Sequence, residues 1–184
     1  MSISQFKINL ACQHLNRGEV IAYPTEAVYG FGCDPLNKQA VLALLDLKQR
    51  PIDKGLILIA AEIAQLEPYI RLNATILERI TPTWPGPVTW VIPAQDWVPH
   101  WLTGKHTSLA VRVTNHPVAR KLCQRFNGAL VSTSANPSNK PAVKQAQKLI
   151  RYFPKQAFYL LSGSVGNLGK ETAIYDAISG KQFR

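Results

Sequence analysis

The chain has 184 residues, of which 46% are hydrophobic, and this size and composition are typical of one domain spanning residues 1–184. Its 21 Lys and Arg against 11 Asp and Glu give a formal net charge of +10, which favours polyanionic partners such as nucleotides or RNA, although excess basic residues can also serve solubility alone. The cysteines at 12, 33 and 123 are widely spaced and include no Cys-x-x-Cys pair, which argues against a disulfide framework and a zinc site.

Predicted helices and strands alternate along the chain. Hydrophobic periodicity predicts helices at 3–17, 37–50, 74–80, 117–126 and 142–153, and strands at 20–23, 56–60, 88–92, 109–113, 129–133, 158–161 and 172–178. Residues Ile3, Phe6, Leu10 and Leu15 would form the buried stripe of the first helix, and Gly18 would end it. The short interval between 88–92 and 109–113 leaves no room for a crossover helix, so those strands should pair antiparallel. We therefore expect an α/β fold with a twisted mixed parallel/antiparallel sheet and flanking helices.

No apolar stretch is long enough to span a membrane, and the first residues contain no long hydrophobic signal core. A cytoplasmic location is the expectation. After the first strand, Pro24 opens a segment of small and polar residues that is typical of a functional loop. Thr25 and Tyr29 in this loop could donate hydrogen bonds to a small substrate, although Tyr29 could equally belong to the core.

Lys48 and Arg50 form the first candidate anion site. Two residues apart on an ideal helix they would point about 200° apart, so a shared ligand requires the helix to end between them. Pro51 supplies that ending, because a residue before proline is displaced toward extended geometry. Both cations could then bind phosphates. The alternative is that they only neutralise the negative C-terminal end of the helix.

Polar residues following the strand 129–133 form the second half of this site. Ser132, Ser134 and Asn136 project to one side of an extended chain, beyond a strand end where α/β sheets tend to bind ligands. An ordinary Ser- and Asn-rich turn would have the same composition. Arg112 lies within the apolar run 109–113, where a charge is costly to bury unless it pairs with an acid or an anionic ligand. Both explanations of Arg112 remain open.

Other chemical signatures are weak. The glycine-rich segment 163–172 does not match a P-loop, because Glu171 stands where a hydroxyl residue should follow Lys170. It could be a lid, a hinge or a simple turn. The four histidines have no metal-ligand spacing, so no protein metal site is expected. The four tryptophans could stack on nucleic acid or anchor the core and loops; they are Trp84, Trp90, Trp97 and Trp101.

Five segments occur together in an order that resembles the YrdC/TsaC family of threonylcarbamoyl-AMP synthases. They are Tyr23-Pro-Thr-Glu-Ala-Val-Tyr-Gly30, Lys48-Gln-Arg-Pro51, Trp84-Pro-Gly-Pro-Val-Thr89, Val111-Arg-Val113 and Ser132-Thr-Ser-Ala-Asn-Pro137. The resemblance covers nearly the whole chain. It implies a YrdC-like α/β fold and a nucleotidyltransferase that forms threonylcarbamoyl-AMP and pyrophosphate from L-threonine, bicarbonate and ATP, the first step toward t6A at tRNA position 37.

The resemblance also implies roles for individual residues. Lys48 and Arg50 would be the catalytic residues. ATP would be bound by Lys48, Arg50, Ser108, Ser134 and Asn136, and threonine or its carbamate by Thr25, Tyr29, Arg112, Ser132 and Thr172. Mg²⁺ would accompany ATP and help pyrophosphate leave. An N-carboxythreonine that attacks the α-phosphate needs alignment and charge neutralisation more than a protein nucleophile.

The chain departs from the family pattern in two respects. Ala60 and Ala61 stand where many relatives have a polar residue, and the extra C-terminal domain of longer relatives is lacking. Short bacterial members pass the intermediate to the proteins TsaD, TsaB and TsaE, and direct contact with tRNA or double-stranded RNA is a further expectation. Two other functions remain open: an RNA-binding module without turnover, and a sibling enzyme that forms a carbamoyl-adenylate from carbamoyl phosphate.

Overall fold

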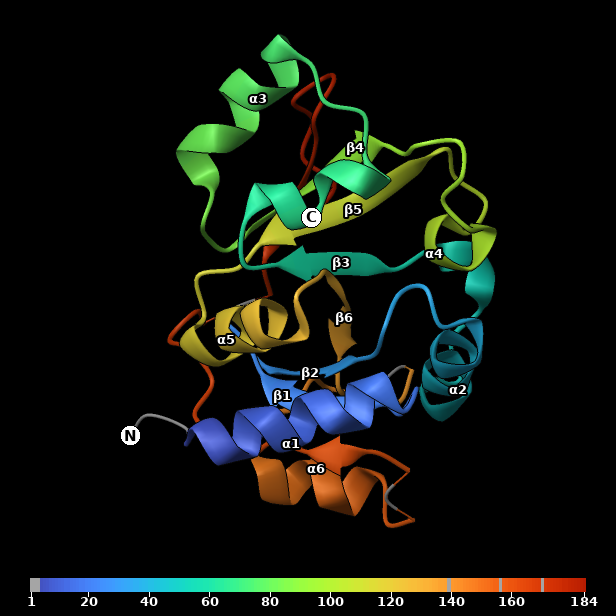
Figure 1. The fold of residues 1–184 in the computed structure, drawn as a ribbon, viewed down its shortest axis with the longest axis vertical. Coiled ribbons are helices and arrows are strands. Elements are labelled where there is room, and N and C mark those ends of the chain that lie inside the picture. The colour runs from blue at the N-terminus through green and yellow to red at the C-terminus, as the bar shows by residue number, and fades with distance from the viewer. Residues whose placement is uncertain (1–3, 139, 156, 170) are drawn as a thin grey trace.

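The computed structural model describes residues 4–138, 140–155, 157–169 and 171–184. Within these ranges the strands form one eight-stranded sheet in the order β7-β1-β2-β6-β3-β5-β4-β8 (Figure 1). The strands are β1 Ile21–Pro24, β2 Tyr29–Gly32, β3 Ile57–Ala60, β4 Val88–Pro93, β5 Ser108–Val113, β6 Leu130–Ser134, β7 Tyr159–Leu160 and β8 Ala173–Asp176. The pairs β1–β7, β3–β5 and β4–β8 are parallel and the other neighbouring pairs are antiparallel, which confirms the mixed sheet.

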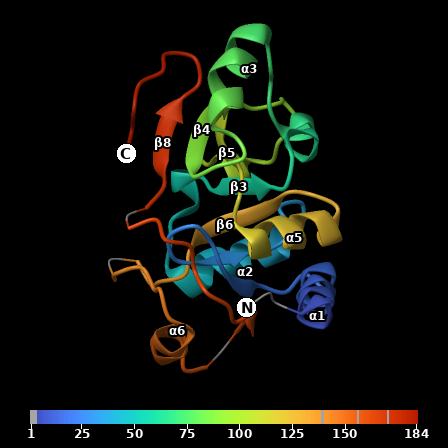
Figure 2. The same ribbon diagram turned by 90° about the vertical axis from the view of Figure 1, so that its left-hand side faces the viewer.

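Helices pack on both faces of the sheet. They are α1 Gln5–Asn16, α2 Lys38–Lys48, α3 Ala74–Ile80, α4 His100–Thr103, α5 Pro117–Phe126 and α6 Ala146–Tyr152, with short 3₁₀ turns at Ile52–Lys54, Ile63–Gln65, Glu67–Tyr69 and Thr81–Thr83. Figure 2 shows α1 and α5 on the same side of the sheet, where they enclose a small core with Ile59 and Leu130. The larger core lies on the other face and includes the buried sides of α2 and α3. No helix in the described ranges has the length and apolar character needed to cross a membrane.

Helix α1 buries a different stripe from the predicted one. The buried side chains are Ile8, Ala11, Cys12 and Leu15, whereas Phe6 is 75% exposed. This stripe still follows helical spacing, but it contains small residues that allow α5 to approach closely. Ile3 lies outside the described residues. The predicted end of the helix is confirmed, because Gly18 adopts a φ of +75° and the amides after the helix bond back to its last carbonyls.

Helix α2 begins and ends at specific caps. The side chain of Asn37 accepts a hydrogen bond from the amide of Ala40 at 3.0 Å, as its predicted capping role requires. At the other end, Gln49 adopts a left-handed φ of 51°, and the amide of Arg50 donates to the carbonyl of Leu45 at 2.9 Å. The helix therefore ends before Pro51, and the chain direction changes between Lys48 and Arg50.

The segment after β1 is not the open loop that we predicted. It is a hairpin in which Pro24 pairs with Tyr29, so β2 was missed. The two glycines of β2 obscured the strand pattern, yet Gly32 is required there because an added Cβ would lie 2.6 Å from the carbonyl oxygen of Val131 on β6. Helix α6 begins at Ala146 and is shorter than the predicted 142–153. The carbonyl of Val143 accepts a hydrogen bond from the amide of Tyr29 on β2, so this part of the chain is bonded to the sheet and is not helical.

The C-terminal segment folds back along β8. The amide of Phe183 donates to the carbonyl of Ile174 at 2.8 Å, and the amide of Asp176 donates to the carbonyl of Lys181 at 2.8 Å. The strand predicted at 172–178 is therefore shorter, and the chain turns after Asp176. This return places the side chain of Arg184 beside the start of β8, at the cavity described next.

Candidate active site

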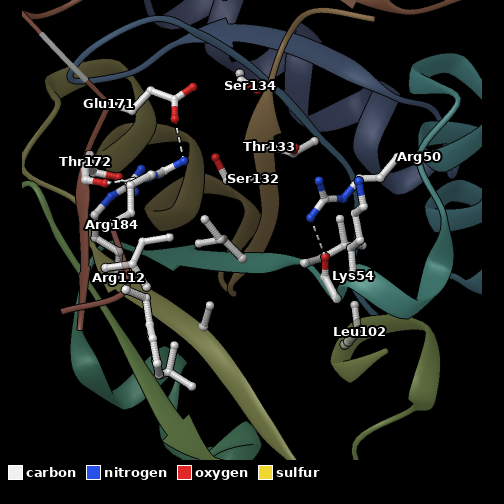
Figure 3. A pocket seen from close by; sticks show the side chains of 18 of the residues that line it. Arg50, Lys54, Leu102, Arg112, Ser132, Thr133, Ser134, Glu171, Thr172 and Arg184 are labelled. Carbon is white, nitrogen blue, oxygen red and sulfur yellow. Dashed lines mark hydrogen bonds and ion pairs between the residues drawn. The ribbon is translucent and has the colours of Figure 1, made fainter. Parts of the chain in front are cut away.

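A cavity of about 530 Å³ lies over the sheet, bounded by the β1–β2 hairpin, strands β3, β5 and β6, and the C-terminal segment. Figure 3 shows Arg50 and Lys54 on one side of it and Arg112, Thr172 and Arg184 on the other. Side chains from Ser132 to Ser134 on β6 lie between these two groups. The cavity therefore has two cationic sides joined by a hydroxyl-rich wall.

Strand alternation explains why polar side chains line this wall. On β5, Leu109, Val111 and Val113 point into the larger core, so Ser108, Ala110 and Arg112 face the opposite side. On β6, Val131 points into the same core and Ser132 faces the cavity. On this face of the sheet, helices α1 and α5 cover Ile59 and Leu130. They do not cover Ser132, which lines the cavity.

Arg112 is buried at the bottom of the cavity and is held on several sides. Its Nη1 donates to the hydroxyls of Thr89 at 3.1 Å and Thr172 at 3.2 Å, and its Nη2 lies 3.3 Å from Oε2 of Glu26. Both explanations offered by the sequence therefore hold, since Arg112 is paired with an acid and also lines the cavity. Its buried Nε has no hydrogen-bond partner among the described residues. The site can still bind an anion through this arginine.

Arg50 provides the cation on the other side. Its Nη2 donates to the carbonyl of Gly55 at 2.9 Å, which orients the guanidinium along the cavity wall. Burial lowers the pKa of Arg50, and its Nε has no partner within the described part of the chain. Lys54, on the 3₁₀ turn that follows Pro51, lines the same side. Two cations in one partly buried wall are suited to a phosphate chain.

Three predicted site residues do not reach the cavity. The ammonium of Lys48 is buried and donates to the carbonyls of Ser134 and Asn136. The amide of Asn136 donates to the carbonyls of Pro137 and Lys140. Lys48, at the end of α2, binds the turn after β6, and only Arg50 of the two lines the cavity.

Tyr29 is the third of these residues. It is 1% exposed, and its hydroxyl donates to the carbonyl of Gly163 at 2.5 Å and accepts from the amide of the same residue at 2.9 Å. The side chain therefore anchors the glycine-rich segment and belongs to the core. The other predicted site residues, Thr25, Arg50, Ser108, Arg112, Ser132, Ser134 and Thr172, all line the cavity.

Sequence reasoning missed Lys54, Glu171 and Arg184. Arg184 forms an ion pair with Glu171 and also donates to the carbonyl of Thr172 through Nε at 3.2 Å and Nη2 at 3.1 Å. The position of Lys54 four residues after Arg50 was a usable signal. No pattern in the sequence indicated Arg184, because only the return of the chain along β8 brings this residue to the cavity.

All four tryptophans are anchored through their indole nitrogens, as the anchoring alternative expects. Each indole N–H donates to a protein acceptor: the carbonyl of Val88, the hydroxyl of Thr83 and the carbonyls of Pro68 and Pro35. These bonds join the loops around β4 and α4 to the body of the fold. Trp97 nevertheless remains 52% exposed.

Among the described residues, no group of three or more His, Cys, Asp and Glu side chains could hold a metal ion. The carboxylate of Glu171 at the cavity is engaged by Arg184, and the carboxylate of Asp176 accepts from the amides of Ile178 and Ser179. The arrangement can bind anions at two places, exclude much of the solvent around Arg112 and offer hydroxyls between the two. These features define an α/β protein whose cavity carries cationic side chains on two sides and hydroxyls between them.

Comparisons with known proteins agree with this class. The family model Sua5/YciO/YrdC, described as "telomere recombination", matches residues 13–184. The chain belongs to this family. It is 50% identical over 183 residues to "Threonylcarbamoyl-AMP synthase" of Methylococcus capsulatus, covering 99% of this chain and 98% of that protein. It is 46% identical over 183 residues to the protein of the same name from Pseudomonas paraeruginosa, covering 99% and 98%.

Solved structures resemble the fold as a whole. The crystal structure of P. abyssi Sua5 complexed with L-threonine matches with a TM-score of 0.89 and 32% identity, covering 96% of this chain and 52% of that one. This chain therefore spans about half of the P. abyssi protein. The crystal structure of E. coli YciO matches with a TM-score of 0.83 and 24% identity, covering 94% and 84%, and supports the fold alone.

Proposed function

We propose that this protein is a threonylcarbamoyl-AMP synthase, a nucleotidyltransferase that uses L-threonine, bicarbonate and ATP. The observation that carries the proposal is the two-sided cavity, with Arg50 and Lys54 facing Arg112 and Thr172 across the serines of β6. An amino acid carboxylate and a triphosphate are both anions and need separate cationic sites, with the reacting atoms held between them. Relatives with this printed name at 46–50% identity over nearly their whole length support the assignment.

In this proposal, the threonine carboxylate binds near Arg112, with the hydroxyls of Thr25, Ser132 and Thr172 around it. Thr25 already donates to the carbonyl of Val28 at 2.8 Å, which fixes its side chain at the hairpin tip. The phosphates of ATP bind along Arg50, Lys54, Ser108 and Ser134. Lys48 and Asn136 support this wall from behind.

The chemistry joins the two halves of the cavity. The amine of threonine combines with bicarbonate and releases water to form a carbamate. A carbamate oxygen then bonds to the α-phosphorus of ATP, while the bond from that phosphorus to the leaving pyrophosphate breaks. The protein supplies alignment and positive charge, and no side-chain nucleophile is needed. Mg²⁺ enters as part of the MgATP substrate, because Mg²⁺ is usually held by substrate phosphates and a few carboxylates.

A turnover assay tests the function directly. The protein is incubated with ATP, Mg²⁺ and bicarbonate, with and without L-threonine, and pyrophosphate and the adenylate product are measured. Threonine-dependent pyrophosphate with a threonylcarbamoyl adenylate is the expected result. Pyrophosphate that requires carbamoyl phosphate but not threonine would identify the carbamoyl-adenylate-forming sibling. RNA binding without any pyrophosphate would identify the binding module.

A matched pair of variants links the activity to the cavity. Arg50→Ala should abolish measurable ATP binding while the protein remains folded. Arg71→Ala removes an exposed arginine that pairs with Asp96 outside the cavity and should leave ATP binding unchanged. ATP binding that is unchanged in Arg50→Ala would place the nucleotide elsewhere.

The place of the reaction in the cell is also part of the proposal. The adenylate would be transferred to tRNA in the cytoplasm by TsaD, TsaB and TsaE, and the net charge of +10 would favour contact with tRNA or double-stranded RNA. Co-purification of the labelled adenylate with those three proteins and tRNA would test the transfer. RNA binding that persists unchanged at high salt would contradict a contact based on charge.

A further inference from the structure

A cluster of hydrogen bonds joins the C-terminal end of α2 to the turn that follows β6. Lys48 Nζ donates to the carbonyls of Ser134 and Asn136, at 2.8 Å for the second of these. In the opposite direction, the amide of Ser138 donates to the carbonyl of Lys48 at 3.0 Å. The hydroxyl of Ser138 lies 2.9 Å from the carbonyl oxygens of both Lys48 and Gln49 and shares its single proton between them. We call this cluster the α2–β6 clamp.

The clamp has a clear physical basis. The last carbonyls of a helix lack partners within the helix and carry partial negative charge. Ser138 supplies donors to two of these carbonyls, at Lys48 and Gln49. The ammonium of Lys48 in turn donates to the carbonyl of Asn136 and to that of Ser134, which also accepts from the amide of Asn136. Each segment therefore supplies hydrogen-bond donors to carbonyls of the other.

The two clamped segments carry residues of the same cavity wall. Arg50 follows Gln49 directly and lines the cavity, where its guanidinium is held by the carbonyl of Gly55. Ser134 ends β6 and lines the cavity from the neighbouring segment. The separation of Arg50 and Ser134 therefore depends on contacts made behind the wall. Within the described residues, no hydrogen bond joins Arg112 to a residue of the clamp.

We propose that Ser138 is a positioning residue for the nucleotide substrate, which acts through the clamp by holding Arg50 and Ser134 at a fixed separation. The identity of the nucleotide as ATP rests on the proposed function. Ser138 itself does not line the cavity, and its contribution comes from the two helix-end carbonyls that it binds.

The test compares Ser138→Ala, Ser138→Thr and the control Ser179→Ala. Ser179 is an exposed turn serine whose hydroxyl also bonds to a backbone group, the amide of Lys181, far along the chain from the clamp. In Ser138→Ala we expect the KM for ATP to rise about three- to ten-fold while the KM for threonine changes less than about two-fold. Ser138→Thr keeps the hydroxyl and should restore most of the ATP affinity. Ser179→Ala should leave both KM values unchanged.

Equal increases of both KM values would indicate general loosening and would overturn the proposal, as would an unchanged KM for ATP. A binding measurement keeps this result separate from the proposed function. Titration of each variant with MgATP alone reports nucleotide affinity even if wild-type protein makes no pyrophosphate with threonine. Weaker MgATP binding only in Ser138→Ala supports the clamp, and equal binding by all variants contradicts it.

Lys48→Met supplies a second, independent variant. If Lys48 and Ser138 act as one unit, the double variant should lose less MgATP affinity than the product of the two single losses. Multiplicative losses would mean that the two residues act separately, and this outcome would overturn the clamp. If Lys48→Met does not fold, amide hydrogen exchange decides: the amides of Ala135, Asn136 and residue 138 should exchange faster in Ser138→Ala than in Ser179→Ala, and equal rates would contradict the proposal.

Discussion

Arg112 and Glu26 form an ion pair in which both side chains are almost completely buried, with 6% and 10% of their surfaces exposed. The second carboxylate oxygen of Glu26 accepts a hydrogen bond from the hydroxyl of Thr114 at 2.6 Å. The pair connects the tip of the β1–β2 hairpin to the end of β5. A buried guanidinium is thereby paired with a carboxylate while it also lines the cavity.

Replacing Glu26 by Gln should destabilise the protein by roughly 2–4 kcal/mol, because Arg112 would remain buried without a counter-charge. Urea unfolding followed by tryptophan fluorescence measures the change. Asp96→Asn is the control, since its pair with Arg71 is exposed and should contribute less than about 1 kcal/mol. Equal effects of the two substitutions would show that the Glu26 pair does not compensate a buried charge.

Arg112→Lys should raise the KM for threonine by about ten-fold or more and leave the KM for ATP nearly unchanged. The planar guanidinium contacts Thr89, Thr172 and Glu26 together, and a lysine ammonium has neither the shape nor the number of donors to do so. Steady-state kinetics with each substrate varied in turn separate the two effects. Arg71→Lys, at an exposed position, serves as control. A larger effect on ATP than on threonine would reverse the proposed orientation of the substrates.

The pH dependence of stability should contain a contribution from Lys48. Burial, and next the neighbouring Arg50, lower the pKa of Lys48 to about 8 from the usual 10.5. Between these two values the unfolded chain binds more protons than the folded protein, so the free energy of unfolding contributed by this group rises with pH across that window. Below about pH 8 both states are protonated and the contribution is constant.

The measurement is the difference in free energy of unfolding between wild type and Lys48→Met at several pH values. From pH 8 to 10 the free energy of unfolding of wild type should rise relative to that of Lys48→Met by up to about 1 kcal/mol per pH unit. Lys121→Met, an exposed position on α5, should show no such change relative to wild type. A difference for Lys48 that falls with rising pH would contradict the assigned environment.

Gly166→Ala should reduce stability, because an added Cβ would lie 2.5 Å from the carbonyl oxygen of Glu26. The amide of Gly166 also donates to the carbonyl of Thr25 at 2.9 Å, so the segment cannot move away without losing a contact to the hairpin tip. Gly169→Ala is a matched control, since an added Cβ there meets nothing within 4 Å. Thermal unfolding of both variants and the KM for threonine give the comparison. Equal melting temperatures of the two variants would show that the backbone at Glu26 can move away from an added Cβ without loss of stability.

Hydrophobic periodicity predicted most elements well because their patterns are local. The predicted range 74–80 for α3 matches Ala74–Ile80, and that for α5 matches Pro117–Phe126. Errors arose where distant parts of the chain decide the conformation. Strand β2 contains Gly32, whose place is explained by the closeness of Val131 on β6 and Tyr23 on β1, and α6 begins late because Val143 bonds to Tyr29.

The sequence by itself determined the α/β class, the cationic and hydroxyl residues of the site and the end of α2 before Pro51, because helix signals, strand alternation and proline act over a few residues. Only the tertiary structure decided which of these side chains share a cavity. Lys48 binds the carbonyl of Asn136 in the turn after β6, and Arg184 at the end of the chain lines the cavity. Both positions depend on strand pairing and hydrogen bonds between distant segments, which no local pattern encodes.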